Sequence, residues 1–357
     1  MCEELWDSDS ELYVDPLKPK GLTADPHVAY GLLGFMGVKN AAGNPVKLVL
    51  SGKFPKAQYM SLQIYRGWPI QTNVKVGAEL SDFRIKPKTG KNRFATLNPN
   101  DTGTFEIEIT PDPAQGPNRI WYEPRDQPGP SAAITAFYRI YQPETEIRFS
   151  DLPKIEAFDM ETNAPTDCPT PVTLPWYIRL PFVEAAAEFA IQEQNPILFK
   201  DNNDTIFGEN PPIGGSGDIV YQHSFSKVPR GKVVVIKFRA PAINFGAPQV
   251  PGRFVRYWSF CSVYELQLKT LNGVASAPQN PEERDVTVVF GPDDQEIRSM
   301  ANALNAEFLP DTREPGQNTV MFILRNLLPT DDFKPFEGPY APKANVLSRS
   351  DFMSLLV

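Results

Sequence analysis

Short apolar runs recur along this chain, and in some of them apolar and polar residues alternate. The clearest is Thr104–Ile109 (T-F-E-I-E-I), which has the pattern of a strand with one buried face. Pro, Gly, Asn or Asp bound most of these runs, as expected at turns. The runs predict strands over Val46–Ser51, Gln58–Tyr65, Leu80–Ile85, Thr104–Thr110, Arg119–Tyr122, Ala133–Tyr141, Ile219–Phe225, Lys232–Arg239, Phe254–Leu268, Asp285–Phe290 and Thr319–Arg325.

Helical patterns are few, so we expect an all-β protein with a few short helices. One pattern spans Val183–Gln194, just after Pro181, and a second spans Asp294–Glu307. Asp293 or Asp294 is a suitable N-cap for the second. Both helices are interpreted as packing elements that cover the end of a sheet.

The order of several segments recurs in the two halves of the chain, which predicts an internal duplication. The segment Lys53–Tyr65 resembles Lys227–Arg239, and the alternating strand Phe105–Thr110 has a counterpart in Val286–Phe290. Downstream of both, Arg139 and Arg325 each lie four residues before a proline. We interpret this arginine pair as fixing each sheet to its turn.

Each copy has the strand number and turn punctuation of a β-sandwich or jelly roll. The predicted organisation is a first lobe over residues 1–150, a Pro-rich crossover over 151–181, a second lobe over 182–330 and a C-terminal arm over 331–357. The chain contains 37 prolines, which favour stiff connections between short strands. The groove between the lobes is the expected ligand site.

The charge and hydropathy of the chain restrict its partners. The net charge of −8 argues against nucleic acid as a partner. No apolar stretch has the length of a membrane span. The sequence starts without the basic and apolar regions of a signal peptide, so we expect a soluble chain, compatible with secretion if a signal peptide is absent from this sequence. The oligomeric state stays open between a monomer and a homodimer.

The sequence gives no sign of a cofactor. Three cysteines allow at most one disulfide, and two histidines without acidic or thiol neighbours at ligand spacing argue against zinc, copper or iron. The loop Gly214–Asp218 matches no nucleotide-binding pattern. We therefore expect no metal and no organic cofactor, although calcium held by scattered carboxylates stays open.

The densest group of polar and aromatic residues is Gly252–Cys261. On a strand, Arg256, Trp258 and Phe260 would face one way, presenting a guanidinium beside an indole to an electron-rich ring. The alternative is a core aromatic strand with Arg256 in an internal ion pair. Cys261, in the same strand, is interpreted as a buried and inert thiol.

A second group comprises Asp218, Tyr221 and His223. His223 can move a proton near neutral pH, with Tyr221 or Asp218 close by, whereas the alternative is a surface histidine. Further aromatic surface for a substrate is expected from three residues of the first half. These are Tyr65, Trp68 and Trp121.

The string Arg253–Cys261 (R-F-V-R-Y-W-S-F-C), with Gly231–Pro241 upstream, resembles a largely uncharacterised family of secreted bacterial and fungal proteins that share an R-Y-W-S-x-C core. The chain lacks the second downstream cysteine of many members, which puts the family disulfide at Cys261 in question. More faintly, the chain resembles the cofactor-free hetero-Diels–Alderases of fungal tropolonic sesquiterpenoid biosynthesis. That resemblance implies dehydration of a hydroxylated aromatic to a quinone methide, followed by addition to a terpene alkene.

Two classes of function follow. The first is a cofactor-independent cyclase or pericyclase acting on a hydrophobic or aromatic small molecule, with Arg256, His223 and Tyr221 as catalytic residues. Its substrate contacts are expected from Trp258, Phe260, Asp218, Tyr65, Trp68 and Trp121. The alternative is a secreted carbohydrate- or lipid-binding protein without catalysis, and glycoside hydrolysis by a carboxylate pair stays untested.

Overall fold

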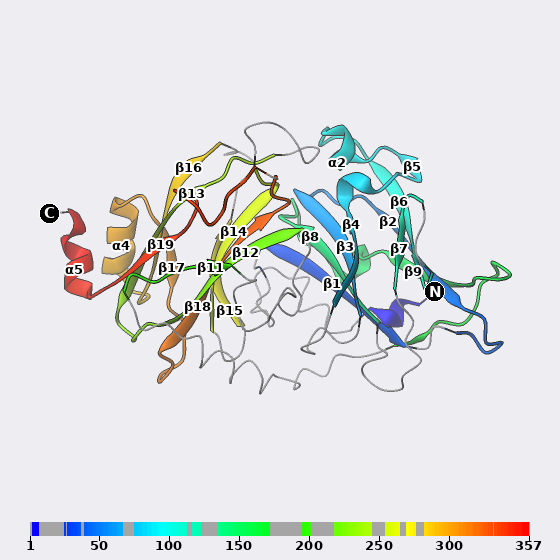
Figure 1. Cartoon of the computed structure of the whole chain (residues 1–357), viewed down its shortest axis with the longest axis horizontal. Helices are drawn as coiled ribbons and strands as arrows, with labels where there is room; N and C mark the ends of the chain where they lie inside the picture. The colour runs from blue at the N-terminus through cyan, green and yellow to red at the C-terminus, as the bar shows by residue number, and fades with distance from the viewer. Residues whose placement is uncertain are drawn as a thin grey trace.

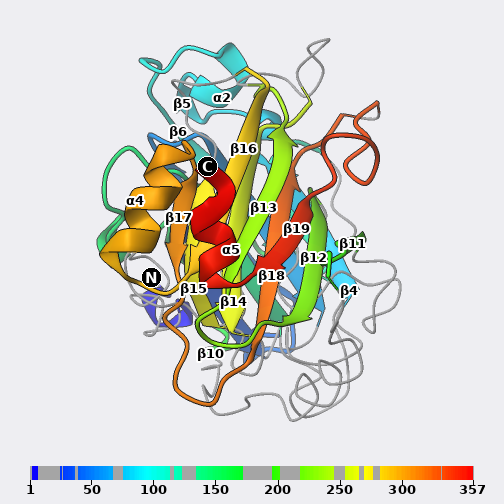
Figure 2. The same cartoon turned by 90° about the vertical axis from the view of Figure 1, so that its left-hand side faces the viewer.

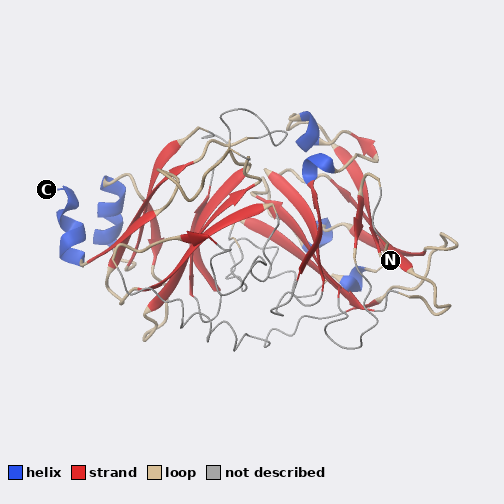
Figure 3. Cartoon of the chain, viewed as in Figure 1, coloured by secondary structure: helices blue, strands red, loops and turns tan. Residues whose placement is uncertain are grey.

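Two β-sandwiches lie side by side in this chain, and in its described part four sheets hold the strands (Figures 1 and 3). The computed structural model describes residues 2–6, 25, 27–36, 39–66, 75–112, 116–122, 134–171, 195–201, 218–244, 254–264, 269–275, 282–330 and 332–356. Over these residues the predicted all-β class with a few short helices is confirmed.

The first sandwich consists of an inner sheet of order β10-β1-β8-β3-β4 and an outer sheet of order β5-β6-β2-β9, with β7 parallel to β6. Its strands are β1 (Val28–Met36), β2 (Val46–Lys53), β3 (Tyr59–Arg66), β4 (Lys75–Ser81), β5 (Thr89–Gly90), β6 (Gly103–Thr110), β7 (Arg119–Trp121), β8 (Ile134–Tyr141), β9 (Lys154–Asp159) and β10 (Thr170–Pro171). Its short helices are η1 (Glu3–Leu5), η2 (Asp82–Arg84), α2 (Arg93–Thr96) and η4 (Phe149–Asp151).

The second sandwich has an inner sheet of order β11-β12-β18-β14-β15 and an outer sheet of order β17-β16-β13-β19. Its strands are β11 (Lys200–Asp201), β12 (Ile219–Lys227), β13 (Val233–Ala240), β14 (Tyr257–Tyr264), β15 (Lys269–Ala275), β16 (Arg284–Gly291), β17 (Glu307–Pro310), β18 (Thr319–Leu327) and β19 (Lys343–Leu347). Helices α4 (Gln295–Ala303), α5 (Arg349–Met353) and η6 (Ser354–Leu356) complete it. Figure 2 shows α4 and α5 on the outer sheet, where Ile297 and Phe352 bury against Val235 and Val289.

The strand order is the same in the two sandwiches. The inner run β1-β8-β3-β4 corresponds to β12-β18-β14-β15, and the outer run β6-β2-β9 corresponds to β16-β13-β19. Each outer sheet also carries one parallel strand, β7 or β17. An internal duplication would explain this equivalence and stays a prediction.

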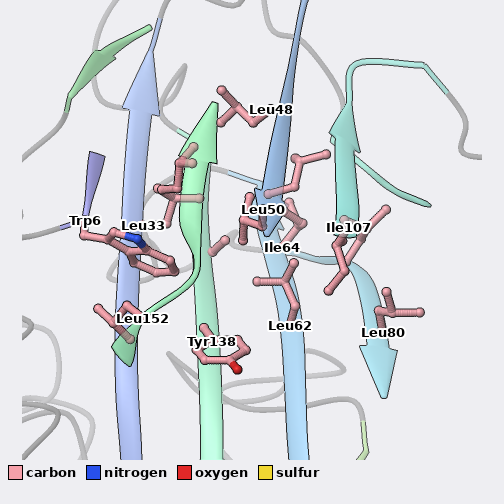
Figure 4. Close-up of a cluster of buried hydrophobic side chains, with 14 of the residues drawn as sticks. Trp6, Leu33, Leu48, Leu50, Leu62, Ile64, Leu80, Ile107, Tyr138 and Leu152 are labelled. Carbon is pink, nitrogen blue, oxygen red and sulfur yellow. The ribbon is translucent and has the colours of Figure 1, made fainter. Parts of the chain in front are cut away.

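Each sandwich encloses its own hydrophobic core. Alternate residues of β2 and β6, such as Leu48, Leu50 and Ile107, meet Leu62 and Ile64 of β3 (Figure 4). This is the arrangement that the alternating pattern of Thr104–Ile109 predicts.

Several boundaries differ from the sequence prediction. Residues 80–85 form the end of β4 and then η2, because the Asp82 carboxylate accepts the backbone N–H of Phe83 and that of Met60 at the turn. Residues 154–159, assigned to the crossover, form β9 and pair with β2. Residues 343–347, assigned to the arm, form β19 and pair with β13.

The sequence similarity between the halves pairs some strands correctly and one strand with the wrong counterpart. It aligned β3 with β13, whereas the sheet order makes β13 the counterpart of β2 and β14 the counterpart of β3. The matches of β6 with β16 and of Arg139 with Arg325 agree with the sheet order. Helix α4 begins after Asp294, whose side chain accepts the N–H of Ile297, as predicted. The predicted helix Val183–Gln194 lies outside the described residues.

A disulfide between Cys2 and Cys168 ties the start of the chain to the first sandwich. The N–H of Cys2 donates to the carbonyl oxygen of Ile155 in β9, and Trp6 packs on the inner sheet beside Leu33 (Figure 4). Because 166 residues separate the two cysteines, the bond removes much freedom from the unfolded chain.

Replacing both cysteines with serine (Cys2→Ser, Cys168→Ser) is expected to lower the free energy of unfolding by about 3 to 5 kcal/mol, since the loop closure is lost. Urea denaturation followed by circular dichroism measures this loss. A reducing agent should destabilise the wild type by a similar amount and leave the variant unchanged. An unchanged midpoint in the variant would contradict the stabilising role of the bond.

Candidate functional site between the sandwiches

The two inner sheets face each other (Figure 1), and aromatic side chains lie between them. Tyr59 and Tyr141 of the first sandwich meet Tyr257 of the second, and the Tyr141 ring centroid lies 5.3 Å from each of the other two. Leu327 of β18 belongs to the same buried cluster. The face that a single sandwich would turn to solvent is therefore buried here.

Two hydrogen bonds from side chains to backbone carbonyl oxygens cross this interface reciprocally. Gln58 and Arg256 occupy equivalent positions, each one residue before the strand β3 or β14. Gln58 Nε2 donates to the carbonyl oxygen of Arg256 at 2.8 Å, and Arg256 Nε donates to that of Gln58 at 3.2 Å. The two halves thus contact each other through matching positions.

Two carboxylates also make reciprocal hydrogen bonds, each to a tyrosine of the opposite sandwich. Asp218, which precedes β12, accepts a hydrogen bond from the Tyr59 hydroxyl of the other sandwich at 2.5 Å. Asp25, which precedes β1, accepts one from the Tyr257 hydroxyl at 3.0 Å. Tyr59 and Tyr257 are the first residues of the equivalent strands β3 and β14. Each half therefore supplies an acid to a phenol of the other.

Arg256 and Asp82 form a buried ion pair between the sandwiches, with Arg256 Nη2 and Asp82 Oδ2 at 3.2 Å. Burial raises the pKa of Asp82 to about 7, although Arg256 and the N–H groups of Met60 and Phe83 act in the opposite direction. The internal ion pair, the alternative left open for Arg256 from the sequence, is the arrangement found.

A second pair of arginines occupies the middle strand of each inner sheet. Arg139 of β8 lies opposite Tyr30 and Ser61 on the neighbouring strands. Arg325 of β18 lies opposite Tyr221 and Ser259 in the same way. Directly opposite residues share a face, so each sheet presents one Tyr-Arg-Ser row towards the other sandwich. These are the arginines that the repeat in the sequence had matched.

Arg139 is 2% exposed and is enclosed by polar and aromatic groups. Its Nη1 donates to Gln63 Oε1 and its Nη2 to the Tyr65 hydroxyl oxygen, both at 2.7 Å. Its guanidinium lies 5.0 Å from the Phe137 ring centroid. Burial disfavours the cation, but Tyr65, other phenols and Glu79 outweigh it and raise the pKa of Arg139 further. Arg139 is therefore a permanent positive charge that is buried from solvent.

Arg325 is 4% exposed, and its Nη1 donates to Cys261 Sγ at 3.1 Å. Burial opposes ionisation of Asp25, but the charge of Arg325, aided by His27 and Ser259, lowers the pKa of Asp25. Cys261 is fully buried, as predicted, and burial raises the pKa of its thiol to about 12.

Two polar groups beside Arg139 have no hydrogen-bond partner among the described residues. They are Ser61 Oγ and Gln63 Nε2, and both residues are fully buried. Unpaired buried donors are rare in folded proteins because each one costs about 1 to 3 kcal/mol. Both side chains lie on the same face of β3 as Tyr59 and Tyr65, which belong to the cluster between the sandwiches.

The structure brings several of the predicted site residues to this interface. Tyr221 raises the pKa of both Arg139 and Arg325, so its phenol lies near both guanidinium groups. Tyr65 accepts a hydrogen bond from Arg139, and Asp218 accepts one from Tyr59. His223 follows two residues after Tyr221 on the same face of β12 and stands edge-on to the Phe225 ring at 5.7 Å. It is 6% exposed, so the surface position considered for His223 is not found.

Other predicted site residues lie elsewhere. Trp258 and Phe260 belong to the core of the second sandwich, where both pack against Phe238, so they do not form a substrate platform beside Arg256. Trp121 ends β7 at the edge of the outer sheet. Trp68 lies outside the described residues.

Arg139, Arg325, Asp25 and Gln63 were not among the site residues predicted from the sequence. The repeat of Arg139 and Arg325 was the available signal, but it was assigned to turn fixation. The described part of the chain holds no group of three or more His, Cys, Asp or Glu side chains arranged for a metal. None of its helices is long and apolar enough to cross a membrane.

A groove of about 510 Å³ lies on the solvent face of the first sandwich's outer sheet. Glu108 in this groove is bonded by Lys47 at 3.1 Å and by Arg119 at 2.7 Å, and Lys47 lies over the Phe158 ring. The charged side chains of Lys47, Glu108 and Arg119 thus pair with one another, as is typical of a solvent-exposed sheet face.

Comparison with known proteins gives the fold and no function. No family model and no curated protein matches the chain. An uncharacterised protein from Burkholderia cenocepacia has a similar structure, with a TM-score of 0.55 and 14% identity over 94% of this chain and 80% of that chain. A protein from Vibrio parahaemolyticus is 11% identical over 97% of this chain and 99% of its own, with a TM-score of 0.47. The first likeness indicates a shared fold only.

The raised pKa of Asp82 predicts a pH dependence of stability. The folded state keeps the proton up to about pH 7 and the unfolded chain only to about pH 4, so stability from this group is full at low pH and falls as pH rises through that window. The loss is at most about 1.4 kcal/mol per pH unit, because one proton is released. Asp25 has a lowered pKa and acts only below this window.

Urea denaturation of wild type and Asp82→Asn at pH 4.5, 6 and 7.5 measures the effect. The stability of the wild type relative to the variant should fall steadily with pH. A difference that is flat over this range would show that Arg256 holds the pKa of Asp82 in its ordinary range.

Proposed function

We propose that the protein is a cofactor-independent enzyme of the cyclase or pericyclase class, acting on an aromatic or terpenoid small molecule at the face between the two sandwiches. The observation that supports this most is the array around Arg139, in which a buried cation and phenols lie beside two unpaired donors, Ser61 Oγ and Gln63 Nε2. Buried ionisable groups concentrated at one place are a recognised mark of functional sites.

The geometry fits a reaction that depends on orientation and hydrogen bonding. A hetero-Diels–Alder addition forms two σ bonds between a heterodiene and an alkene without gaining or losing an atom. Donors aimed at the oxygen of the heterodiene stabilise the charge that develops there. Arg139 and Tyr65 both donate to Gln63 Oε1, which leaves the Gln63 amide nitrogen to donate to such an oxygen. Aromatic neighbours such as Phe137 supply surface for the rings.

A preceding dehydration would need proton transfer. The benzylic C–O bond breaks, the hydroxyl takes up a proton and leaves as water, and the phenol of the substrate loses its proton to give the quinone methide. Tyr221 and His223, which lie on one face of β12, are the proposed groups for these transfers. Arg256 is committed to Asp82 and Gln58, so Arg139 takes over the orienting role that Arg256 had in the sequence-based hypothesis.

Secretion is part of the same proposal. The Cys2–Cys168 disulfide supports an oxidising compartment, because structural disulfides persist outside the cytosol in most organisms.

Carbohydrate binding is the second candidate, and the groove on the outer sheet favours it. Lys47, Glu108 and Phe158 combine charged hydrogen-bonding groups with one ring, which are the groups that a sugar contacts. This function would need no catalytic residue.

The enzyme proposal predicts a stereoselective product. An ortho-hydroxybenzyl alcohol incubated with a terpene alkene and the protein should give one enantiomer of the cyclic ether, whereas the uncatalysed reaction gives the racemate. Tyr65→Phe should lower the rate about tenfold or more, because the orientation of Gln63 is lost. Chiral chromatography with mass detection measures both the rate and the enantiomeric ratio.

Tyr138→Phe is the matched control, since Tyr138 is an equally buried tyrosine in the core of the first sandwich and should be dispensable for turnover. A racemic product at the uncatalysed rate with the wild type would refute the enzyme proposal. Equal losses in both variants would refute the placement of the site.

A further inference from the structure

We infer that the first sandwich binds a carboxylate at Ser61 and Gln63, beside Arg139, in the position equivalent to the one that Asp25 occupies in the second sandwich. This inference rests on the proposed function for the place of the substrate and deepens it by naming the substrate class. The substrate is an aromatic or isoprenoid acid, held by its carboxylate between the two inner sheets.

The second sandwich shows what such a site looks like when it is filled. Ser259 Oγ and the Tyr257 hydroxyl both donate to Oδ2 of Asp25, and Oδ1 of the same carboxylate accepts the N–H of His27. Arg325 lies directly opposite Ser259 in the sheet and stabilises the charge. In the second sandwich, the Asp25 carboxylate therefore accepts the hydrogen bonds of these donors.

The first sandwich repeats this row, and among the described residues no carboxylate bonds its serine. Ser61 takes the place of Ser259 and lies directly opposite Arg139. The acid that crosses from the other half, Asp218, bonds Tyr59 and Ser81. It therefore contacts the neighbouring strand β4, and Ser61 Oγ makes no hydrogen bond to any described residue.

The unpaired groups beside Arg139 suit a ligand group that only accepts hydrogen bonds. Arg139 Nη1 at 2.7 Å and the Tyr65 hydroxyl at 2.9 Å both donate to Gln63 Oε1, which fixes the amide with Nε2 unpaired. Ser61 Oγ and Gln63 Nε2 can both donate, and the guanidinium supplies a positive charge. Glu79 is the nearby anion on β4, and its Oε2 accepts the backbone N–H of Asp218 at 3.2 Å. A carboxylate satisfies these donors best.

Isothermal titration calorimetry of the full chain tests the inference with three carboxylates and their primary amides. The probes are benzoate, salicylate and geranate, with benzamide, salicylamide and geranamide. At least one acid should bind about tenfold or more tightly than its amide, because the amide offers one acceptor and brings its own donors. Ser61→Ala should weaken that acid about tenfold, since a hydrogen bond to a charged group is lost.

Two further variants keep the test decisive. Ser262→Ala removes another buried and unpaired hydroxyl, on the equivalent strand β14 but on the side of the core, so it should change acid binding by less than about twofold. Gln63→Glu keeps the shape and places a negative charge against Arg139, so it should abolish acid binding while the protein stays folded.

The outcomes separate this inference from the enzyme proposal. No binding of any of the three acids, or equal binding by wild type, Ser61→Ala and Gln63→Glu, overturns the carboxylate site. Turnover of the neutral alcohol and alkene without acid binding would leave the enzyme proposal standing and overturn this inference. Acid binding with the predicted variant pattern and no turnover would support the site and overturn the catalytic proposal.

Discussion

The exchange of Asp25 and Asp218 between the sandwiches is the interaction on which the rest of this structure depends. Each acid precedes the first long strand of its own half and accepts the hydroxyl of a tyrosine that begins an equivalent strand in the other half. An inner sheet that turned these rows of tyrosine and arginine to solvent would gain little from them. Facing each other, the two inner sheets bury these residues, and Asp25 and Asp218 accept hydrogen bonds from phenols across the interface.

Burial of this polar face has chemical consequences. In a low dielectric, charges act strongly on their neighbours, which is why Asp82 and Asp25 shift in opposite directions although both are buried beside an arginine. Asp25 receives several donors besides the charge of Arg325, so its ionised form is favoured. At Asp82, burial outweighs the charge of Arg256 and two backbone N–H groups, and the negative charge of Asp218 raises the pKa further. The neighbouring charges therefore differ between the two carboxylates, because His27 lowers the pKa of Asp25 whereas Asp218 raises that of Asp82.

The equivalent rows of the two sandwiches differ in their hydrogen bonding. In the second sandwich, Ser259 of the Arg325 row donates to Asp25, and Arg325 and Asp25 stabilise each other's charge across the interface. In the first sandwich the Arg139 row retains unpaired donors at Ser61 and Gln63. The equivalent strand order of the two sandwiches thus carries different hydrogen bonding at equivalent positions.

Much of the fold was predictable from local pattern, and the site was not. Alternation along β6 and the N-cap Asp294 act within a few residues, so both were read correctly from the sequence. Strand β1 (V-A-Y-G-L-L-G-F-M) is buried on both faces and shows no alternation, so it was missed. The partner of Arg256 lies 174 residues away in Asp82, and no local pattern carries such information.

The most direct test of this account is a crystal structure of the protein soaked with the aromatic acid that binds it most tightly. The account predicts density for the acid between the inner sheets, with its carboxylate within hydrogen-bond distance of Ser61 Oγ and Gln63 Nε2. Density only in the outer groove, against Lys47 and Phe158, would contradict it and would assign the interface between the sandwiches a purely structural role.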